Sequence, residues 1–235
     1  MKQILFFLSL LLFTCHLYAQ VDPTDQKISV LLGHRYSGGF DPHGYEQYSY
    51  TGVFKIDGKY YLKPTKIRVH ATTDPCSRDS IFSTQALESG ECLYLFWNLG
   101  QYKNEAIETH YIAPDYRFIY PGKNYIFTFN KQQYSFTATG VVNLKDNSID
   151  NYRLILINET KRMTQVLVAE DSLNESIVEI LFIGDLDGDK NPDFIINAPP
   201  YKETRNILLF LSSHTKNKNA MVHRVSEQFD WFDCE

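Results

Sequence analysis

The sequence predicts a mainly β protein built from antiparallel sheets, with little helix. Short segments of alternating apolar and polar residues recur along the chain, and turn-forming residues separate them. Aromatic residues make up 14% of the 235 residues, with 16 Tyr and 16 Phe, and aromatic side chains favour strands. We find no heptad or tandem repeat that would indicate a coiled coil or a repeat fold.

The chain begins with a segment that is typical of a secretory signal peptide. Lys2 supplies a positive charge, residues 4–13 form an apolar run, and residues 17–19 provide the cleavage signal. We therefore expect cleavage after Ala19 and a secreted or periplasmic protein. The apolar run is too short to span a bilayer comfortably, and no later segment is apolar enough to do so. Cys15 alone would suit a lipid anchor, but the residues before it do not suit that processing.

Removal of the first 19 of the 235 residues leaves 216, which suits one large β domain or two small ones. The net charge changes from −5 to −6 because Lys2 is lost, so nucleic acid is not an expected partner. We expect an N-terminal β region over residues 20–146 and a C-terminal β region over residues 147–235. A polar break near residue 146 separates them, although the two regions can also form one continuous domain.

Three cysteines remain after cleavage: Cys76, Cys92 and Cys234. An oxidising compartment favours one disulfide and leaves one thiol. Cys76–Cys92 is the favoured pair because it closes a short loop, and a link from either residue to Cys234 is the alternative. The spacing matches no zinc-binding pattern.

The clearest hairpin in the N-terminal region runs from Val53 to Leu62. Asp57-Gly58 suits a two-residue type I′ turn, in which both residues need a positive φ. This register places Phe54 opposite Tyr61 and Val53 opposite Leu62.

Other elements of this region are less regular. We expect strands at residues 28–32, 66–70 and 92–99, and a short helix at residues 80–88. Clear alternation returns over residues 120–140, where apolar residues at every second position face one side of two strands.

The C-terminal region predicts a blade-like four-stranded sheet. Its strands are expected at residues 176–183, 193–197, 206–212 and 220–227, after a hairpin formed by residues 152–157 and 164–170. The run NILLFL within residues 206–212 is apolar on both faces, so this strand should lie centrally in the sheet.

A metal-binding loop is expected between the first two strands of this sheet, in the sequence DLDGDKNPD. Carboxylates at alternate positions of a tight loop can converge on one point, and Ca²⁺ takes six to eight oxygen ligands. Gly188 permits the sharp turn. The expected ligands are Asp185, Asp187, Asp189, the main-chain carbonyl of Asn191, and Asp193.

An EF-hand loop does not fit this sequence. It needs glycine at position six and a bidentate acidic residue at position twelve, which are Lys190 and Ile196 here. It also needs a following helix, whereas Phe194-Ile195-Ile196 is an apolar run that predicts a strand.

The strand–loop–strand form, with Asp at position nine, resembles the calcium loops of FG-GAP and VCBS-type repeats, which occur in integrin-like propeller blades. Lys190 departs from the glycine usual there. The loop occurs once, so a complete propeller of several blades is not expected. The C-terminal part of the chain also resembles that of an uncharacterised group of secreted bacterial proteins. The resemblance lies in the pieces YRLILI, TQVLVAED, GDLDGDKNPDF, LLFLSS and Cys234. That resemblance implies no particular activity.

Two classes of function remain after a search for catalytic motifs. The sequence contains no GxSxG, HExxH, Walker loop, GxGxxG or CxxC. We therefore expect a non-enzymatic binding or structural module of the bacterial envelope, stabilised by calcium, whose partner is a protein or a glycan. The alternative is a hydrolase of unrecognised type with a structural calcium site and with His34 or His43 in a glycine-rich site loop.

Aromatic residues follow that loop. Tyr45, Tyr48 and Tyr50 could stack on a glycan, although such tyrosines more often pack on a sheet.

Overall fold

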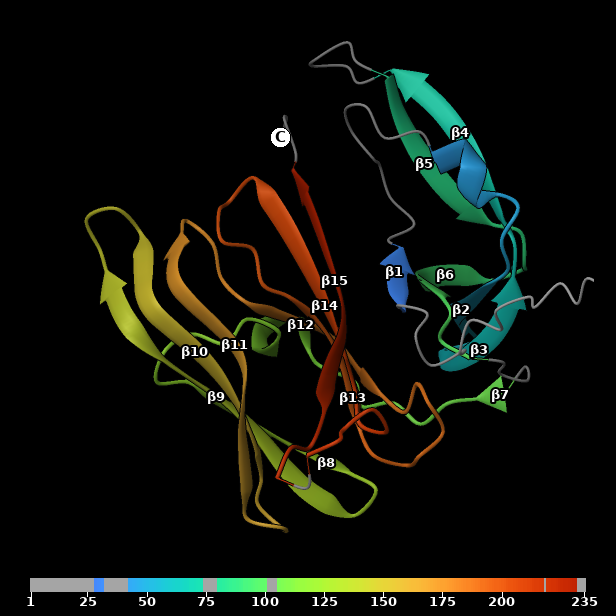
Figure 1. Ribbon diagram of the computed structural model, residues 1–235. Coiled ribbons are helices and arrows are strands. Elements are labelled where there is room, and N and C mark those ends of the chain that lie inside the picture. The colour runs from blue at the N-terminus through green and yellow to red at the C-terminus, as the bar shows by residue number, and fades with distance from the viewer. Residues whose placement is uncertain (1–27, 32–41, 74–79, 101–104, 218, 232–235) are drawn as a thin grey trace, which may run out of the picture.

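The computed structural model describes residues 28–31, 42–73, 80–100, 105–217 and 219–231 (Figure 1). The expected signal peptide and the residues His34, Cys76 and Cys234 lie outside these ranges. Within them, the protein is mainly β, and its helices are two short 3-10 turns, η2 (Pro42–Tyr45) and η3 (Pro114–Tyr116). Neither turn is long and apolar enough to cross a membrane. The predicted fold class is therefore confirmed.

The N-terminal sheet has five antiparallel strands in the order β1-β6-β2-β3-β7. The predicted hairpin is formed by β2 and β3, with Val53 opposite Leu62 and Phe54 opposite Tyr61. Asp57 (φ 49°) and Gly58 (φ 76°) both have positive φ, as the turn type requires. The strands are β1 (Ser29–Leu31), β2 (Tyr50–Ile56), β3 (Lys59–Thr65), β6 (Glu91–Trp97) and β7 (Glu105–Ala106).

A separate two-stranded sheet consists of β4 (Ile67–Thr73) and β5 (Ser80–Ala86). The predicted helix at residues 80–88 is therefore wrong. The pairing of Thr84 with Val69 and of Ala86 with Ile67 places this segment beside a small apolar cluster. A segment of nine residues is too short to form a stable helix alone, so non-local pairing and burial decide its conformation.

A second large sheet has the order β11-β10-β9-β8. The predicted alternation is confirmed, since Phe127 and Phe129 on β8, and Tyr134, Phe136 and Ala138 on β9, are all buried. The strands are β8 (Asn124–Phe129), β9 (Gln132–Asn143), β10 (Ser148–Asn158) and β11 (Met163–Asn174). The expected boundary at residue 146 lies in the turn that joins the paired strands β9 and β10.

The predicted C-terminal sheet is an antiparallel meander in the order β12-β13-β14-β15. The strand predicted to be central, β14, lies between β13 and β15 and is buried along almost its whole length. The strands are β12 (Glu179–Gly184), β13 (Asp193–Asn197), β14 (Thr204–Leu211) and β15 (His223–Trp231).

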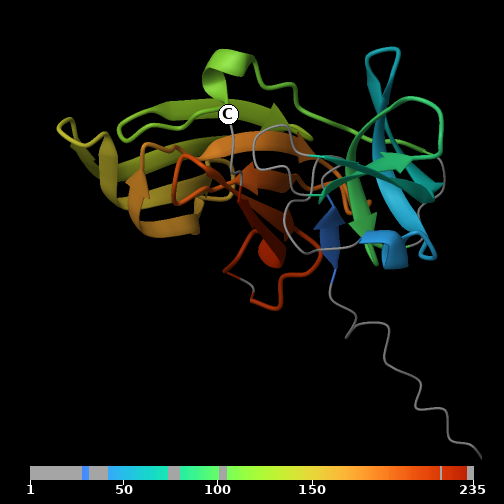
Figure 2. The same ribbon diagram turned by 90° about the horizontal axis from the view of Figure 1, so that it is seen from above.

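This C-terminal sheet lies between the other two large sheets (Figures 1 and 2). Side chains on one of its faces, including Phe194, Leu208 and Phe210, pack in the core with β8–β11. Side chains on the other face, including Ile195 and Leu209, pack with the N-terminal sheet. The near-continuous apolar runs of β13 and β14 follow from this burial on both faces.

Candidate metal centre

Residues 185–192 form the loop between β12 and β13, and the pair Gly184–Asp193 closes the loop at its base. Two loop residues have left-handed backbone conformations, Gly188 (φ 82°) and Lys190 (φ 67°). Gly184 allows a close approach by another segment, because a Cβ there would lie 3.0 Å from the carbonyl oxygen of Glu108. The N–H of Asp185 donates to that same oxygen at 3.0 Å. The base of the loop is therefore held by the pairing of β12 with β13 and by the hydrogen bond from Asp185 to Glu108.

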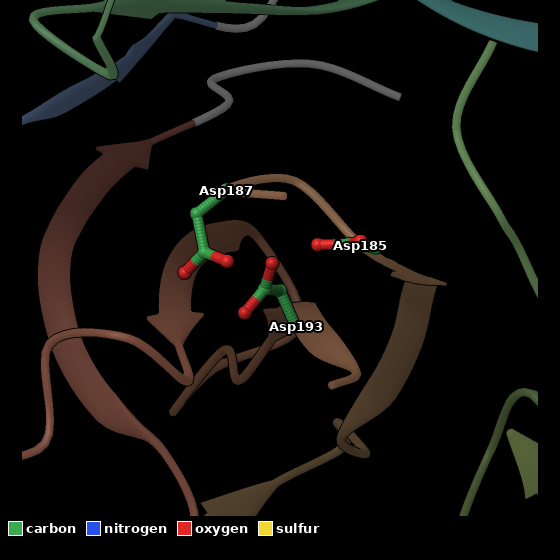
Figure 3. Close-up of side chains that lie close together, drawn as sticks. All are labelled: Asp185, Asp187 and Asp193. Atoms are coloured by element: carbon green, nitrogen blue, oxygen red, sulfur yellow. The ribbon is translucent and has the colours of Figure 1, made fainter. Parts of the chain in front are cut away.

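The loop brings three of the predicted ligands together. Asp185, Asp187 and Asp193 each offer a carboxylate oxygen, and these oxygens all lie within 4.8 Å of one another. Figure 3 shows the three carboxylates pointing toward a common space. Calcium holds its oxygen ligands at about 2.4 Å, so two ligands of one ion can lie at most about 4.8 Å apart. The spacing and the all-oxygen donor set therefore fit a hard cation.

Asp193 is the buried anchor of this cluster, with none of its surface exposed. Its Oδ1 accepts hydrogen bonds from the backbone N–H (2.7 Å) and the hydroxyl (3.0 Å) of Ser212, and its Oδ2 accepts one from the N–H of Leu186 (2.6 Å). A carboxylate oxygen has about two acceptor positions. Oδ2 therefore keeps one position for a cation.

Burial raises the pKa of Asp193 well above its ordinary value, and the nearby carboxylate of Asp187 raises it further. The hydrogen bonds from Ser212 and Leu186 act in the opposite direction. A cation at the centre of the cluster would favour the ionised form of Asp193. It would therefore lower the pKa that burial raises.

Asp185 is held by its own loop. Its Oδ1 accepts from the N–H of Gly188 at 2.7 Å, and its Oδ2 accepts from the N–H of Lys190 at 3.1 Å. Partial burial raises the pKa of Asp185, these two hydrogen bonds lower it, and the carboxylates of Asp187 and Asp189 raise it again. Each oxygen keeps an acceptor position, so the loop orients the carboxylate without saturating it.

Asp187 is held by Ser213, the second residue after the end of β14. Its Oδ2 accepts from the backbone N–H (3.1 Å) and the hydroxyl (2.6 Å) of Ser213. Ser212 and Ser213 were not predicted as site residues. The sequence signal for them is the Ser-Ser pair directly after the apolar strand, which pairing with β13 brings to the loop.

The other two predicted ligands are placed differently. Asp189 lies outside the group of three, and its Oδ1 accepts from the N–H of Asn191 (2.8 Å) and from the hydroxyl of Ser212 (2.9 Å). Asn191 also donates its side-chain amide to Asp189 Oδ2 at 3.1 Å. Asp189 and Asn191 therefore support the turn, and their predicted ligation of the ion stays a prediction.

The other candidate residues are two histidines and three tyrosines of the N-terminal region. His34 lies outside the described part of the chain, and the side chain of His43 is not described. Tyr50 is buried, which agrees with sheet packing, whereas Tyr48 is 38% exposed and packs against Trp97, with ring centroids 5.2 Å apart.

Among the described residues, Cys92 is a free thiol. Burial raises the pKa of this thiol to about 12. The predicted Cys76–Cys92 disulfide has no support here, and because Cys76 and Cys234 lie outside the described residues the pairing stays a prediction.

The chain was compared with protein-family models, with curated proteins and with solved structures, and none of the three comparisons found a match.

Proposed function

We propose that this chain is a secreted or periplasmic calcium-binding β protein that acts as a non-enzymatic binding or structural module of the bacterial envelope. One observation carries the proposal. Three aspartate carboxylates, one of them fully buried, converge within 4.8 Å at the loop between β12 and β13. Three like charges at this distance repel one another, and a divalent cation removes that repulsion.

Calcium is the cation that best suits this donor set. The three ligands are carboxylates, and hard oxygen ligands favour Ca²⁺ or Mg²⁺ over softer transition metals. Magnesium usually keeps several waters and takes only one or two protein carboxylates, whereas calcium accepts many protein oxygens in an irregular loop. The resemblance to FG-GAP and VCBS-type loops supports the same choice.

A structural role for the ion follows from its position. The cluster joins the beginning of β13 to the end of β14 through Asp193 and Ser212, in the sheet that lies between the two large cores. A cation that replaces the repulsion with attraction would stabilise this junction. The signal-peptide pattern at residues 1–19 supports export.

Calorimetric titration of the mature protein with CaCl₂, after treatment with chelator, tests the metal site. We expect one calcium ion per chain and much weaker binding of Mg²⁺. Asp187→Asn should weaken calcium binding by at least about tenfold, in line with loss of one charged ligand. The matched control is Asp57→Asn, which keeps a turn-compatible residue far from the cluster. Equal calcium binding by both variants would contradict the assignment.

Export is tested separately by mass spectrometry of the protein produced with its full N-terminus in a bacterial host. We expect the mature chain to begin at Gln20 and to be found outside the cytoplasm. An uncleaved cytoplasmic chain would contradict the proposed location.

A further inference from the structure

A cavity of about 240 Å³ lies between the β8–β11 sheet and the C-terminal sheet. Its lining comes from strands β9 and β10, the turn between β10 and β11, the loop before β13, and the connection between β14 and β15. At about 30 Å³ for each water molecule, the volume corresponds to roughly eight water-sized groups. The cavity therefore has the size of a small molecule.

The innermost surface of this cavity is apolar. Leu156 and Phe194 have no exposed surface, and Val222 is buried as well. Met163 and Met221 are partly buried and extend the same lining. Methionine side chains adapt their shape to a neighbouring group, so this surface can pack around a small apolar ligand.

The wall contributed by the β14–β15 connection is held in place by Gln165 of β11. The side-chain Oε1 of Gln165 accepts hydrogen bonds from the backbone N–H groups of Met221 (2.7 Å) and Val222 (3.1 Å). Its Nε2 donates to the carbonyl oxygen of Val222 at 2.7 Å. These three hydrogen bonds join the two sheets beside the cavity, so this wall is formed before any ligand binds.

Asn158, at the end of β10, presents a buried donor to the cavity. It is 1% exposed and belongs to the lining. Its Oδ1 accepts from the backbone N–H of Lys161 at 2.8 Å, and its Nδ2 donates to Oε1 of Gln132 at 3.0 Å. A side-chain amide nitrogen carries two protons. Among the described residues, the second proton has no acceptor, and a buried donor without an acceptor costs free energy.

The charge at the cavity is positive. Lys161 is exposed and is the single charged residue among the described residues of the lining. Within the described part of the chain, its ammonium group makes no hydrogen bond or ion pair. An ammonium group carries three donors and no acceptor. The lining thus combines unused donors and one positive charge with an apolar inner surface.

We propose that this cavity binds a small amphiphilic carboxylate, namely a short-chain carboxylic acid in its ionised form. The carboxylate accepts hydrogen bonds from Nδ2 of Asn158 and from the ammonium group of Lys161, and such charge-assisted bonds are the strong ones. The apolar chain of the ligand packs against Leu156 and Phe194. A six-carbon acid has eight non-hydrogen atoms, which matches roughly eight water-sized groups.

This inference goes beyond the proposed function, in which the partner is a protein or a glycan. The two groups assigned to the carboxylate lie at the end of β10 and in the turn that follows it, and neither belongs to the metal cluster. Carboxylate binding and calcium binding can therefore fail independently.

Titration of the ¹⁵N-labelled mature protein with sodium hexanoate, followed by NMR, tests the site. We expect a dissociation constant of about 1 mM or tighter, which a ligand of this size can reach. The side-chain amide signals of Asn158 and the backbone amide signal of Lys161 should shift. Hexan-1-ol has the same chain without the charge, so it should bind at least about fivefold more weakly.

Lys161→Gln removes the charge and keeps a side chain of similar length. We expect it to weaken hexanoate binding by about fivefold or more, through loss of a charge-assisted hydrogen bond. Arg162→Gln is the matched control, because it removes the same charge from the adjacent exposed residue, which lies outside the lining. This variant should bind hexanoate within about twofold of the wild type.

Three outcomes would overturn the proposal. Hexanoate at about 20 mM leaves the Asn158 side-chain signals unchanged, hexan-1-ol binds as tightly as hexanoate, or the two variants lose affinity equally. Each titration is run with calcium and again with chelator. Hexanoate binding under both conditions would support this site even if the protein binds no calcium.

Discussion

Ser212 and Asp193 are joined twice across neighbouring strands. The backbone N–H of Ser212 donates to Oδ1 of Asp193 at 2.7 Å, and the Ser212 hydroxyl lies 3.0 Å from the same oxygen. The hydroxyl also lies 2.9 Å from Oδ1 of Asp189. A hydroxyl has one proton, so it can donate to only one of two ionised carboxylates at a time. The carboxylate that the hydroxyl does not reach keeps a backbone N–H donor, which is Ser212 for Asp193 and Asn191 for Asp189.

Ser212→Ala tests this junction. The substitution removes the hydroxyl and keeps the backbone hydrogen bond, so we expect the free energy of unfolding to fall by about 1–2 kcal/mol. Urea denaturation in the presence of chelator measures the loss. Ser213→Ala is the control, because its hydroxyl contacts Asp187 at an exposed position and should contribute less. Equal losses for the two variants would contradict the role assigned to Ser212.

Much of this arrangement could be predicted from local sequence. The Asp57-Gly58 turn fixed the register of β2 and β3, and the double-sided apolar run of residues 206–212 correctly indicated a central strand. The convergence of Asp185, Asp187 and Asp193 followed from their spacing in a tight loop.

What could not be predicted depends on contacts between distant segments. Ser212 and Ser213 reach the loop only because β14 pairs with β13. Residues 80–86 form a strand because they pair with β4. Asp189 has the same alternate spacing as Asp185 and Asp187. Its Oδ1, however, accepts hydrogen bonds from Asn191 and Ser212 that support the turn. The spacing of the aspartates alone does not show which of them face a cation and which support the turn.

Acid pH should weaken calcium binding through Asp193. The folded-state pKa of Asp193 is raised above the unfolded value of about 3.9, so the folded protein binds more protons between the two values. Without calcium, this contribution to stability is present below the unfolded pKa and is lost as the pH rises through the folded pKa. Calcium binds the ionised form of Asp193. Calcium binding should therefore release protons at pH values between the unfolded and the folded pKa.

Calorimetric titration in two buffers with different ionisation enthalpies measures that release. We expect proton release at acid pH and none at pH values above the folded-state pKa. A proton count of zero throughout the acid range would show that Asp193 does not bind the ion as a carboxylate.

Lys190→Gly should relieve backbone strain in the loop. Lys190 has φ 67°, a region in which a side chain costs roughly 1 kcal/mol. The greater freedom of glycine in the unfolded chain offsets part of the gain, so we expect stabilisation of about 0.5 kcal/mol. Loss of the positive charge from the loop should also tighten calcium binding.

Arg162→Gly is the matched control, because Arg162 has φ 55° in the turn between β10 and β11 and also carries a positive charge. Chemical denaturation should give similar stabilisation for both variants, while titration should show tighter calcium binding for Lys190→Gly alone. An equal change in calcium affinity would mean that the loop charge is not responsible.

Separation of the chain at residue 146 should prevent folding of both fragments. The cut divides β9 from β10, and it exposes a core shared by residues on both sides, such as Phe136 and Phe194, whose ring centroids lie 5.2 Å apart. We expect fragments 20–146 and 147–235 to lack cooperative thermal transitions by circular dichroism. A cooperative transition in the isolated 147–235 fragment would show that it is an independent domain.

The difference between two thermal melts, with excess calcium and with chelator, tests the central claim most directly. Calcium at about 100 times its dissociation constant adds roughly 2.7 kcal/mol to folding stability. For a chain of this length, that corresponds to an increase in Tm of about 5–10 °C. We predict this increase for the wild type and a much smaller one for Asp187→Asn. Identical melting temperatures with calcium and with chelator, in a wild type that also shows no heat on calcium titration, would contradict the calcium site.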